Sequence, residues 1–397
     1  MKQFIIIASI LFVHFGFAQD VETNSSSKIW SLEDCIEYAI ENNITVKDAE
    51  LNTSISEVDY SAAKSAKLPN LFGSASQNFS SGTSIDPITS DYVSDQIHST
   101  NLGINSSVTL FQGNQLTNQV KQNKLLIEQN SLLAQEAKNN IVISILETYL
   151  QTLFSKEGIT IAENNLDASE KEVLRAKSRL DAGTIALSDY TEAQSQAATN
   201  KYNVIAAKND YELNIIDLKQ LLELSPLEDL EIETVNENQD LLHLELNREA
   251  IYTNALSYLP EVEASNTNIL INEKELEIAK GGYLPTLSLT GSLGSGYTSI
   301  SDNTFYDQLD VNFNQRLGLS LNIPIFNRNQ TKSAVQTATF NIEKAEIQKQ
   351  TVEKEVIKKV ETAYQNALSS QEQLVAAEAS QQAAEQSYNL AQKKYEL

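Results

Sequence analysis

The residue types that most often perform catalysis or bind metals are scarce in this chain and lie far apart. Its three histidines, His14, His98 and His243, are isolated from one another, and Cys35 is its one cysteine. Metal sites and nucleophile–base pairs need several such groups at characteristic spacings. The sequence also contains no phosphate-binding loop and no serine-nucleophile motif. We therefore expect no enzyme activity, no catalytic or metal-ligating residues and no cofactor.

The composition excludes further classes. The formal net charge is −24, and so acidic a chain is not expected to bind nucleic acid through its phosphates. The mean hydropathy is −0.29, which is too low for a bundle of membrane-spanning helices. Transmembrane β-strands, in contrast, expose few apolar residues per segment and leave only a weak hydropathy signal.

The N-terminus predicts export. Lys2 precedes an apolar run over residues 4–13, and Gly16 and Ala18 supply small residues for cleavage, so residues 1–18 are typical of a secretory signal peptide. No later apolar run reaches the length of about 20 residues that a spanning helix needs. Cys35 lies too far downstream to be a lipoprotein anchor, and we expect it to be a small buried side chain on the first helix.

The chain contains one structural unit twice, shifted by about 215 residues. The segment Lys67-Leu68-Pro69-Asn70-Leu71 returns as Tyr283-Leu284-Pro285-Thr286-Leu287, and Val108-Thr109-Leu110-Phe111-Gln112 returns as Ile323-Pro324-Ile325-Phe326-Asn327. We predict a first repeat over residues 19–230, a connector over 231–246 and a second repeat over 247–397.

Each repeat is predicted to hold two strands and very long helices. Strict alternation of apolar and polar residues predicts strands at about 70–82, 100–111, 286–299 and 311–326. A long helical hairpin is expected over 114–224, and a long helix over 327–397, because these stretches lack proline and carry apolar or small residues at three-to-four spacing. The expected fold is an α+β membrane protein in which two tandem repeats each combine a β-hairpin with long coiled-coil helices.

The four strands point to an oligomer. Each has about ten residues or more, which is enough for a tilted strand to cross a bilayer. A half-buried sheet in a soluble protein is the alternative, but no other segment offers an apolar partner layer. Four strands cannot close a barrel, and an open edge would leave backbone groups unpaired in lipid. Three copies would give a barrel of 12 strands, so we expect a homotrimer in outer membrane lipid.

These features resemble the TolC-type outer membrane efflux protein family. The resemblance rests on Leu68-Pro69 before a strand, on the stretch from Val108 to Gly113 at a strand–helix junction, and on the stretch Arg179 to Asp189 around Gly183. It covers nearly the whole chain after residue 18. In the second repeat Asn327-Arg328 replaces Gln112-Gly113, so that junction must turn without glycine. The strand–helix junctions are expected at Pro69, Phe111, Gly113, Pro285 and Phe326.

The resemblance also implies a function and partners. It implies an outer membrane exit duct of a tripartite efflux or type I secretion system, with a 12-strand barrel continued by a periplasmic α-helical barrel. A periplasmic adaptor protein and an inner membrane transporter would be its partners. The adaptor would dock at the periplasmic tip, formed by Gly183, Thr184, Leu187, Ser188 and Asp189. Asp189 resembles the tip aspartate that helps to hold the tube closed, although a solvated acid near a helix N-terminus is the simpler interpretation.

Two further expectations follow from the repeat. Aligning Tyr149 with Tyr364 ends the second copy one residue before its tip glycine, so a returning helix, with the second repeat's gating residues, is expected beyond Leu397. The alternative function is a trimeric coiled-coil surface or adhesive protein, for which no repeated hairpin between the helices would be needed. The transported substrate, whether drug, metal ion or polypeptide, and the inner membrane pump are not indicated by the sequence.

Overall fold

The computed structural model describes residues 29–85, 92–234 and 247–395. The predicted signal peptide, residues 1–18, and most of the predicted connector lie outside these ranges. The chain forms two compact units, one of residues 1–37 with 145–237 and the other of residues 38–144 with 238–397. The helices α1 (Leu32–Asn42) and α3 (Gln115–Asp181) each contribute to both units.

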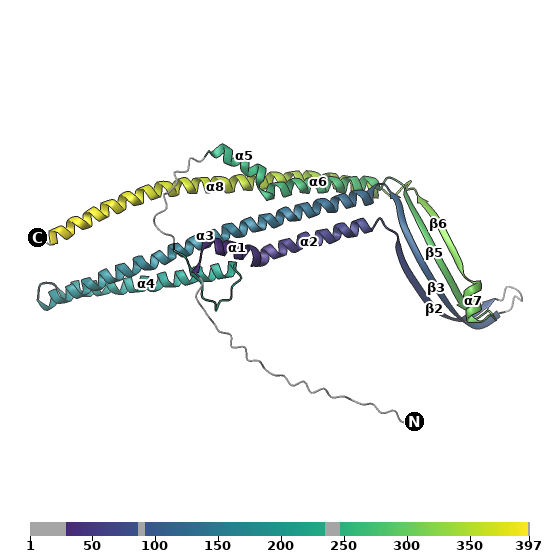
Figure 1. Cartoon of the computed structure of the whole chain (residues 1–397), viewed down its shortest axis with the longest axis horizontal. Coiled ribbons are helices and arrows are strands. Elements are labelled where there is room, and N and C mark those ends of the chain that lie inside the picture. The colour runs from purple at the N-terminus through teal and green to yellow at the C-terminus, as the bar shows by residue number, and fades with distance from the viewer. Residues whose placement is uncertain (1–28, 86–91, 235–246, 396–397) are drawn as a thin grey trace, which may run out of the picture. The chain divides into compact units, whose positions relative to one another are not determined.

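The first unit is a helical hairpin. The second half of α3 packs against α4 (Leu187–Leu221), and the two are joined by the exposed turn at Gly183 (Figure 1). The apolar and small residues that the sequence predicted along one side of α4 are buried in the C-terminal half of that helix. The buried apolar residues of this unit include Cys35, Ile145, Val204, Ile215, Leu218 and Leu222. Cys35 is therefore a buried residue of the first helix, as predicted.

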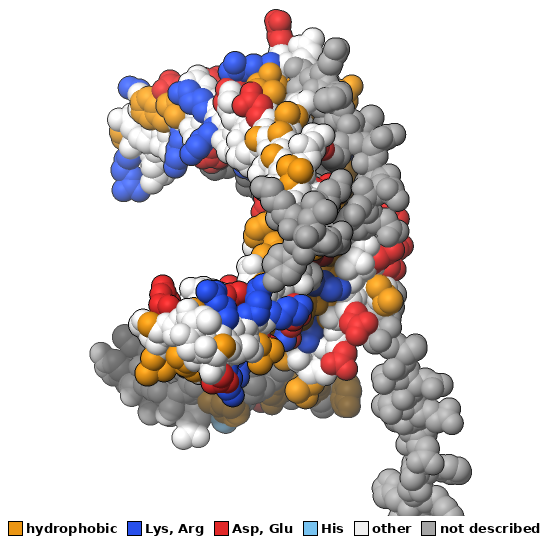
Figure 2. Space-filling view, turned by 90° about the vertical axis from the view of Figure 1, so that its left-hand side faces the viewer, with side chains coloured by type: hydrophobic (Ala, Val, Ile, Leu, Met, Phe, Trp, Pro, Cys, Tyr) orange, Lys and Arg blue, Asp and Glu red, His pale blue; other side chains and the backbone are white. Residues whose placement is uncertain are grey.

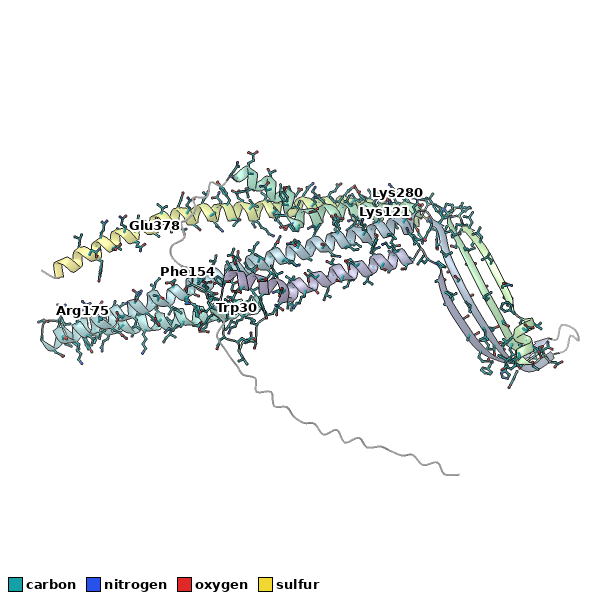
Figure 3. All side chains as sticks on the ribbon, in the orientation of Figure 1. Trp30, Lys121, Phe154, Arg175, Lys280 and Glu378 are labelled. Atoms are coloured by element: carbon teal, nitrogen blue, oxygen red, sulfur yellow. The ribbon has the colours of Figure 1, made fainter. Side chains whose placement is uncertain are left out.

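A short parallel pair of strands lies at the end of this hairpin that is opposite the turn at Gly183. β1 (Ile29–Trp30) pairs with β4 (Glu231–Ile232). The hydroxyl group of Tyr149 on α3 lies 3.2 Å from the carbonyl oxygen of Trp30 and 3.0 Å from that of Glu233, and Trp30 is labelled in Figure 3. Burial, together with the nearby Cys35 and Glu233, raises the pKa of Tyr149 to about 12. One tyrosine thus links β1 and the residue that follows β4 to the helix.

The second unit holds the other helices and the sheet. α2 (Ile44–Ser65), the first half of α3, α6 (Pro260–Gly281) and α8 (Gln330–Tyr395) are long, and α5 (Arg248–Tyr258) packs on α6 and α8. Small and β-branched residues fill the seams, which lets helix axes approach closely. They include Val46, Ala134, Val262, Ala264, Ile271, Ala338, Ala345 and Val356. No helix in the described part of the chain combines the length and hydrophobicity needed to cross a membrane.

One antiparallel sheet continues the helices of this unit. Its strand order is β2 (Asn70–Ile85), β3 (Tyr92–Gln112), β5 (Thr286–Thr298) and β6 (Asn314–Asn322). Figure 1 shows all four strands side by side, with the helices joining them at one end. β3 begins eight residues before its predicted start at 100, because Tyr92–Ser99 continue the ladder with β2.

The fourth strand is shorter than the alternation over 311–326 predicted. Its first predicted residue, Val311, is the last residue of the helix α7 (Phe305–Val311), which Thr304 caps and the buried side chain of Gln308 holds in place. Gln308 accepts from the amide of Thr298 at 2.9 Å and donates to the carbonyl of Asn303 at 2.8 Å. At the other end, residues 323–326 lack a partner on the sheet. Pro324 among them has no N–H to donate to a ladder.

The structure reproduces the sequence repeat element by element. α1, α2, β2, β3 and α3 correspond in order and position to α5, α6, β5, β6 and α8. The registers agree as well, since the pair Asn70–Ser107 in the first hairpin corresponds to Thr286–Asn322 in the second. The two copies therefore share one geometry within the sheet.

Candidate functional site

One face of the sheet is apolar and uncovered. Directly paired residues share a face, and the register places Ile104 beside Leu293, and Leu289 beside Leu319. Leu319 is 66% exposed, and only α7, at one end of β5, packs on this sheet among the described helices of the unit. The apolar face comprises Leu71, Ala75, Phe79, Leu102, Ile104, Val108, Leu287, Leu289, Leu293, Leu317, Leu319 and Leu321.

The opposite face of the sheet is polar. It carries mainly asparagine, serine, threonine and glycine, together with Phe72, which lies opposite Asn105. Arg316 is the only charged side chain on its β6 portion. The polar face comprises Asn70, Ser74, Ser76, Asn101, Asn105, Ser107, Thr286, Ser288, Thr290, Arg316, Ser320 and Asn322. A sheet with one apolar and one polar face can lie between hydrocarbon and water, as the sheet of a transmembrane barrel does.

Both edges of the sheet are open in the described part of the chain. β2 pairs only with β3, and β6 pairs only with β5. Each edge strand therefore presents a row of unpaired backbone donors and acceptors. Such an edge is a template for another strand, and in lipid each unpaired group would cost several kcal/mol.

The first strand–helix junction is extremely tight. Gly113 has φ +55°, and a Cβ atom built on it would lie 2.3 Å from the carbonyl oxygen of Gly281. Gln115 Nε2 donates to the carbonyl of Ile278 at 3.0 Å. The end of β3 is therefore held against the end of α6, and only glycine fits this contact.

The other predicted junction residues lie at the ends of the strands. Pro69 and Pro285 immediately precede β2 and β5, and Phe111 is next to last in β3. Phe326 lies beyond the end of β6 and is exposed. In the second repeat, Arg328 at φ +54° and Asn329 at φ +64° take the place of Gly113 and Asn114. This junction does turn without glycine, as predicted.

The predicted tip residues form the turn between α3 and α4. Gly183 adopts φ +71° with no atom near a hypothetical Cβ, and the amide and hydroxyl of Thr184 both donate to the carbonyl of Arg179 at 2.9 Å. Asp189 accepts from the amide of Ala186 at 3.3 Å, so its described contacts are those of a helix-capping residue. Leu187 is 64% exposed, and Ser188 is exposed beside it. Arg175, labelled in Figure 3, lies on α3 near this turn.

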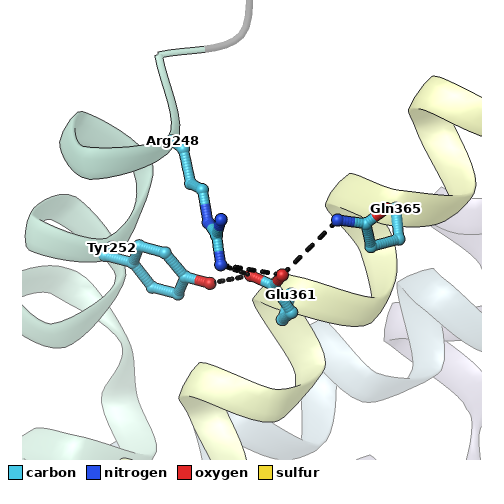
Figure 4. Close-up of polar contacts among 4 residues, drawn as sticks. All are labelled: Arg248, Tyr252, Glu361 and Gln365. Atoms are coloured by element: carbon cyan, nitrogen blue, oxygen red, sulfur yellow. Dashed lines mark hydrogen bonds and ion pairs between the residues drawn. The ribbon is translucent and has the colours of Figure 1, made fainter.

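A polar cluster that the sequence did not reveal joins α5 to α8 (Figure 4). One guanidinium nitrogen of Arg248 donates to both carboxylate oxygens of Glu361 at 2.8 Å, and Tyr252 donates to the same carboxylate. The hydrogen bonds from Tyr252, Gln365 and Arg248 hold the pKa of Glu361 below its ordinary value. More than one hundred residues separate the partners, so no local motif announces them.

A second cluster lies among α3, α6 and α8. Burial, followed by the negative charge of Glu261, raises the pKa of Glu136, while Lys359 opposes the shift. Lys359 Nζ lies 3.9 Å from Glu261. On the face drawn in Figure 2, acidic, basic and hydrophobic side chains are interspersed. Within residues 29–85, 92–234 and 247–395 no group of histidine, cysteine and acidic side chains is arranged to hold a metal ion.

Solved structures define the class of protein to which this architecture belongs. The outer membrane protein VceC of Vibrio cholerae superposes with a TM-score of 0.75, covering 92% of this chain and 85% of that one at 16% sequence identity. The chain thus shares the fold of this outer membrane protein. The family model for outer membrane efflux proteins matches residues 35–223 and 251–397, and the chain belongs to this family.

Curated relatives agree with this assignment. The chain is 24% identical to the outer membrane efflux protein BepC of Brucella suis, over 87% of this chain and 71% of that protein. It is 25% identical to the outer membrane protein TolC of Escherichia coli over 58% of this chain. The match spans about half (48%) of TolC. The predicted family and outer membrane location are confirmed.

Proposed function

We propose that this chain is one subunit of a homotrimeric exit duct in the outer membrane, which passes substrates without catalysis in a tripartite efflux or type I secretion system. The observation that carries the proposal is the two-faced sheet with its open edges. Its apolar face suits lipid, and its polar face suits a water-filled lumen. Membership in the outer membrane efflux protein family supports the same conclusion.

Closure of the sheet supports three copies. One chain supplies four strands, and joining open edges between copies satisfies every backbone group without adding another element. Three copies give 12 strands, which lies within the range of about 8 to 26 strands of bacterial outer membrane barrels. The long helices would continue this barrel as a tube on the periplasmic side.

The exposed turn between α3 and α4 is the proposed docking place for a periplasmic adaptor, which would link the duct to an inner membrane transporter. Gly183, Thr184, Leu187, Ser188 and Asp189 are all exposed, so they are available to a partner. A photocrosslinking amino acid in place of Leu187 should capture the adaptor in cells. The same substitution at Tyr202, which is equally exposed on α4, serves as the control. Equal capture at both positions would refute docking at the tip.

The trimeric coiled-coil adhesin remains the competing function. An adhesin stalk needs no repeated hairpin between its helices, and family membership also favours the duct. Planar lipid bilayers distinguish the two. The protein purified from its own outer membrane should produce discrete ion conductance. The duct would be refuted if the protein produced no conductance at a concentration at which it is shown to bind lipid vesicles.

Orientation provides a second test. A cysteine in place of Asp302, next to the turn between β5 and α7, should react with a membrane-impermeant thiol reagent on intact cells. A cysteine in place of Thr184 should react only after the outer membrane is opened. Reaction of Thr184→Cys alone on intact cells would invert the proposed topology.

A further inference from the structure

The internal repeat predicts which strand of another copy would pair with each open edge of the sheet. Inside one chain, the last strand of the first repeat, β3, pairs with the first strand of the second repeat, β5. At the free edges, the last strand of the second repeat is β6 and the first strand of the first repeat is β2. A second copy of this chain that followed the same rule would add its β2 to β6.

The two hairpins share one register, so the rule can be applied residue by residue. The ladders give the correspondence Asn70 to Thr286 in the first strands and Ser107 to Asn322 in the second strands. Under this correspondence the pair Asn105–Ser292 of the β3–β5 ladder becomes Ser320 of one copy beside Ser76 of the next.

We infer that β6 of one copy pairs antiparallel with β2 of the next copy, with Ser320 directly opposite Ser76, Leu319 opposite Gln77 and Leu317 opposite Phe79. This inference rests on the proposed trimer and specifies its interface. It also explains the unpaired residues 323–326. Their counterparts Val108–Phe111 are paired in the β3–β5 ladder, which ends one residue later at Gln112. Residues 323–326 would therefore extend β6 only when the neighbour's Leu71 and Gly73 are present.

The faces of the sheet agree with this register. Leu317, Leu319 and Leu321 lie on the apolar face, and so do their inferred partners Phe79, Gln77 and Ala75. A slip by one residue would place leucines among the polar side chains and is excluded by the pleat. A slip by two residues keeps the faces matched, so only the repeat distinguishes that register from the inferred one.

Proline supports the assignment of the strand end. The β3–β5 ladder shifts register between Thr109 and Phe111, and Pro324 occupies the position that corresponds to Thr109. Proline is tolerated in sheets at bulges and edges, where its missing N–H costs no ladder bond. The bulge would therefore recur between copies at the place where the sequence has proline.

The correspondence between the two repeats cannot extend from the strands to the junction between strand and helix. Gly113 touches Gly281 so closely that a Cβ would be 2.3 Å from its carbonyl oxygen, but Arg328 occupies the Gly113 position in the second repeat. The corresponding residue of the neighbour would be Ser65, at the end of α2. The junction between copies must therefore be wider than the junction within a chain, and the inferred register is limited to the sheet.

Disulfide trapping tests the register. In a Cys35→Ala background, the variant with Ser320→Cys and Ser76→Cys should form covalent dimers and trimers when cells are treated with a mild oxidant. Directly opposed strand residues are close enough for a disulfide, whereas diagonal neighbours have Cα atoms about 7–8 Å apart and are not. The matched controls combine Ser320→Cys with Ser74→Cys or with Asn78→Cys, which represent slips by two residues.

A positive control lies within the chain. Asn105→Cys with Ser292→Cys reproduces the same geometry inside one copy and should form an intrachain disulfide under the same conditions. Stronger interchain trapping with Ser74→Cys or Asn78→Cys would overturn the register and leave the trimer intact. No interchain trapping in any pair, while the positive control oxidises, would overturn pairing of these edges. Conductance of the unmodified protein decides separately whether the proposed duct stands.

Discussion

The close contact between Gly113 and Gly281 gives the sharpest test of how the strands are joined to the helices. Replacing Gly113 by alanine adds one methyl group to a residue at φ +55°, 2.3 Å from a backbone carbonyl oxygen. The left-handed conformation alone costs a non-glycine residue about 1–2 kcal/mol. Forcing an extra carbon into a packed contact costs about 1–3 kcal/mol more. We therefore expect Gly113→Ala to lower the free energy of unfolding by about 2–5 kcal/mol.

Two other glycines separate these contributions. Gly183 has φ +71° but no atom within 4 Å of a built Cβ, so Gly183→Ala should cost only the conformational part, about 1–2 kcal/mol. Gly158 lies inside α3, also with open space around it, so Gly158→Ala should stabilise by about 0.5–1 kcal/mol. The expected order of stability is Gly158→Ala, then wild type, then Gly183→Ala, then Gly113→Ala.

The assay is urea unfolding of the protein in detergent micelles, followed by far-ultraviolet circular dichroism. Hydrogen exchange of the amides around Gln115 would locate the damage in Gly113→Ala at the junction. Equal losses for Gly113→Ala and Gly183→Ala would refute the reasoning, because they would show that the contact with Gly281 contributes nothing.

Three further predictions concern single side chains. Tyr149→Phe should cost about 1 kcal/mol, and because the folded pKa is raised to about 12, the wild-type protein should lose stability between about pH 10 and pH 12 more steeply than this variant. Glu136→Gln should stabilise at neutral pH, because a raised carboxyl pKa favours folding only at low pH, and the difference should vanish on acidification. Leu319→Arg should cost roughly 2–4 kcal/mol in the bilayer, whereas Ser320→Arg should be tolerated; both can be compared by the temperature at which purified protein loses its assembly.

Each of these has a contradicting result. Identical alkaline unfolding curves for wild type and Tyr149→Phe would refute the hydrogen-bonded role of the phenol. A Glu136→Gln variant that is less stable at neutral pH would show that its charge is favourable in the fold. Equal effects of arginine at positions 319 and 320 would show that the two faces of β6 do not differ in their surroundings.

Most of the fold could be predicted from two features of the sequence, which are the internal repeat and the alternation of apolar and polar residues in the strands. Strands with two distinct faces keep period two over many residues, and Leu287, Leu289 and Leu293 displayed it clearly. The α7 helix was missed because Val311 and Phe313 happen to continue the alternation of β6 toward its start. What ends the strand there is the buried amide of Gln308, whose partners Thr298 and Asn303 could be matched to it only in three dimensions.

The site residues were accessible from sequence only in part. Gly183 and Gly113 could be identified because a turn needs glycine and few glycines are present. The contact between Gly113 and Gly281 joins positions far apart in the chain, as does the link from Arg248 to Glu361, and a single sequence contains no signal for such pairs. For Asp189 the sequence suggested a special role by resemblance, whereas its described bonds are those of an ordinary helix cap.

Counting the chains in the native particle tests the central claim most directly. Native mass spectrometry of the protein extracted from its own outer membrane in detergent reports the number of identical subunits. The two-faced sheet with open edges predicts three chains per particle. A particle that contains a single chain would contradict the account, because its sheet edges would then remain unpaired in lipid.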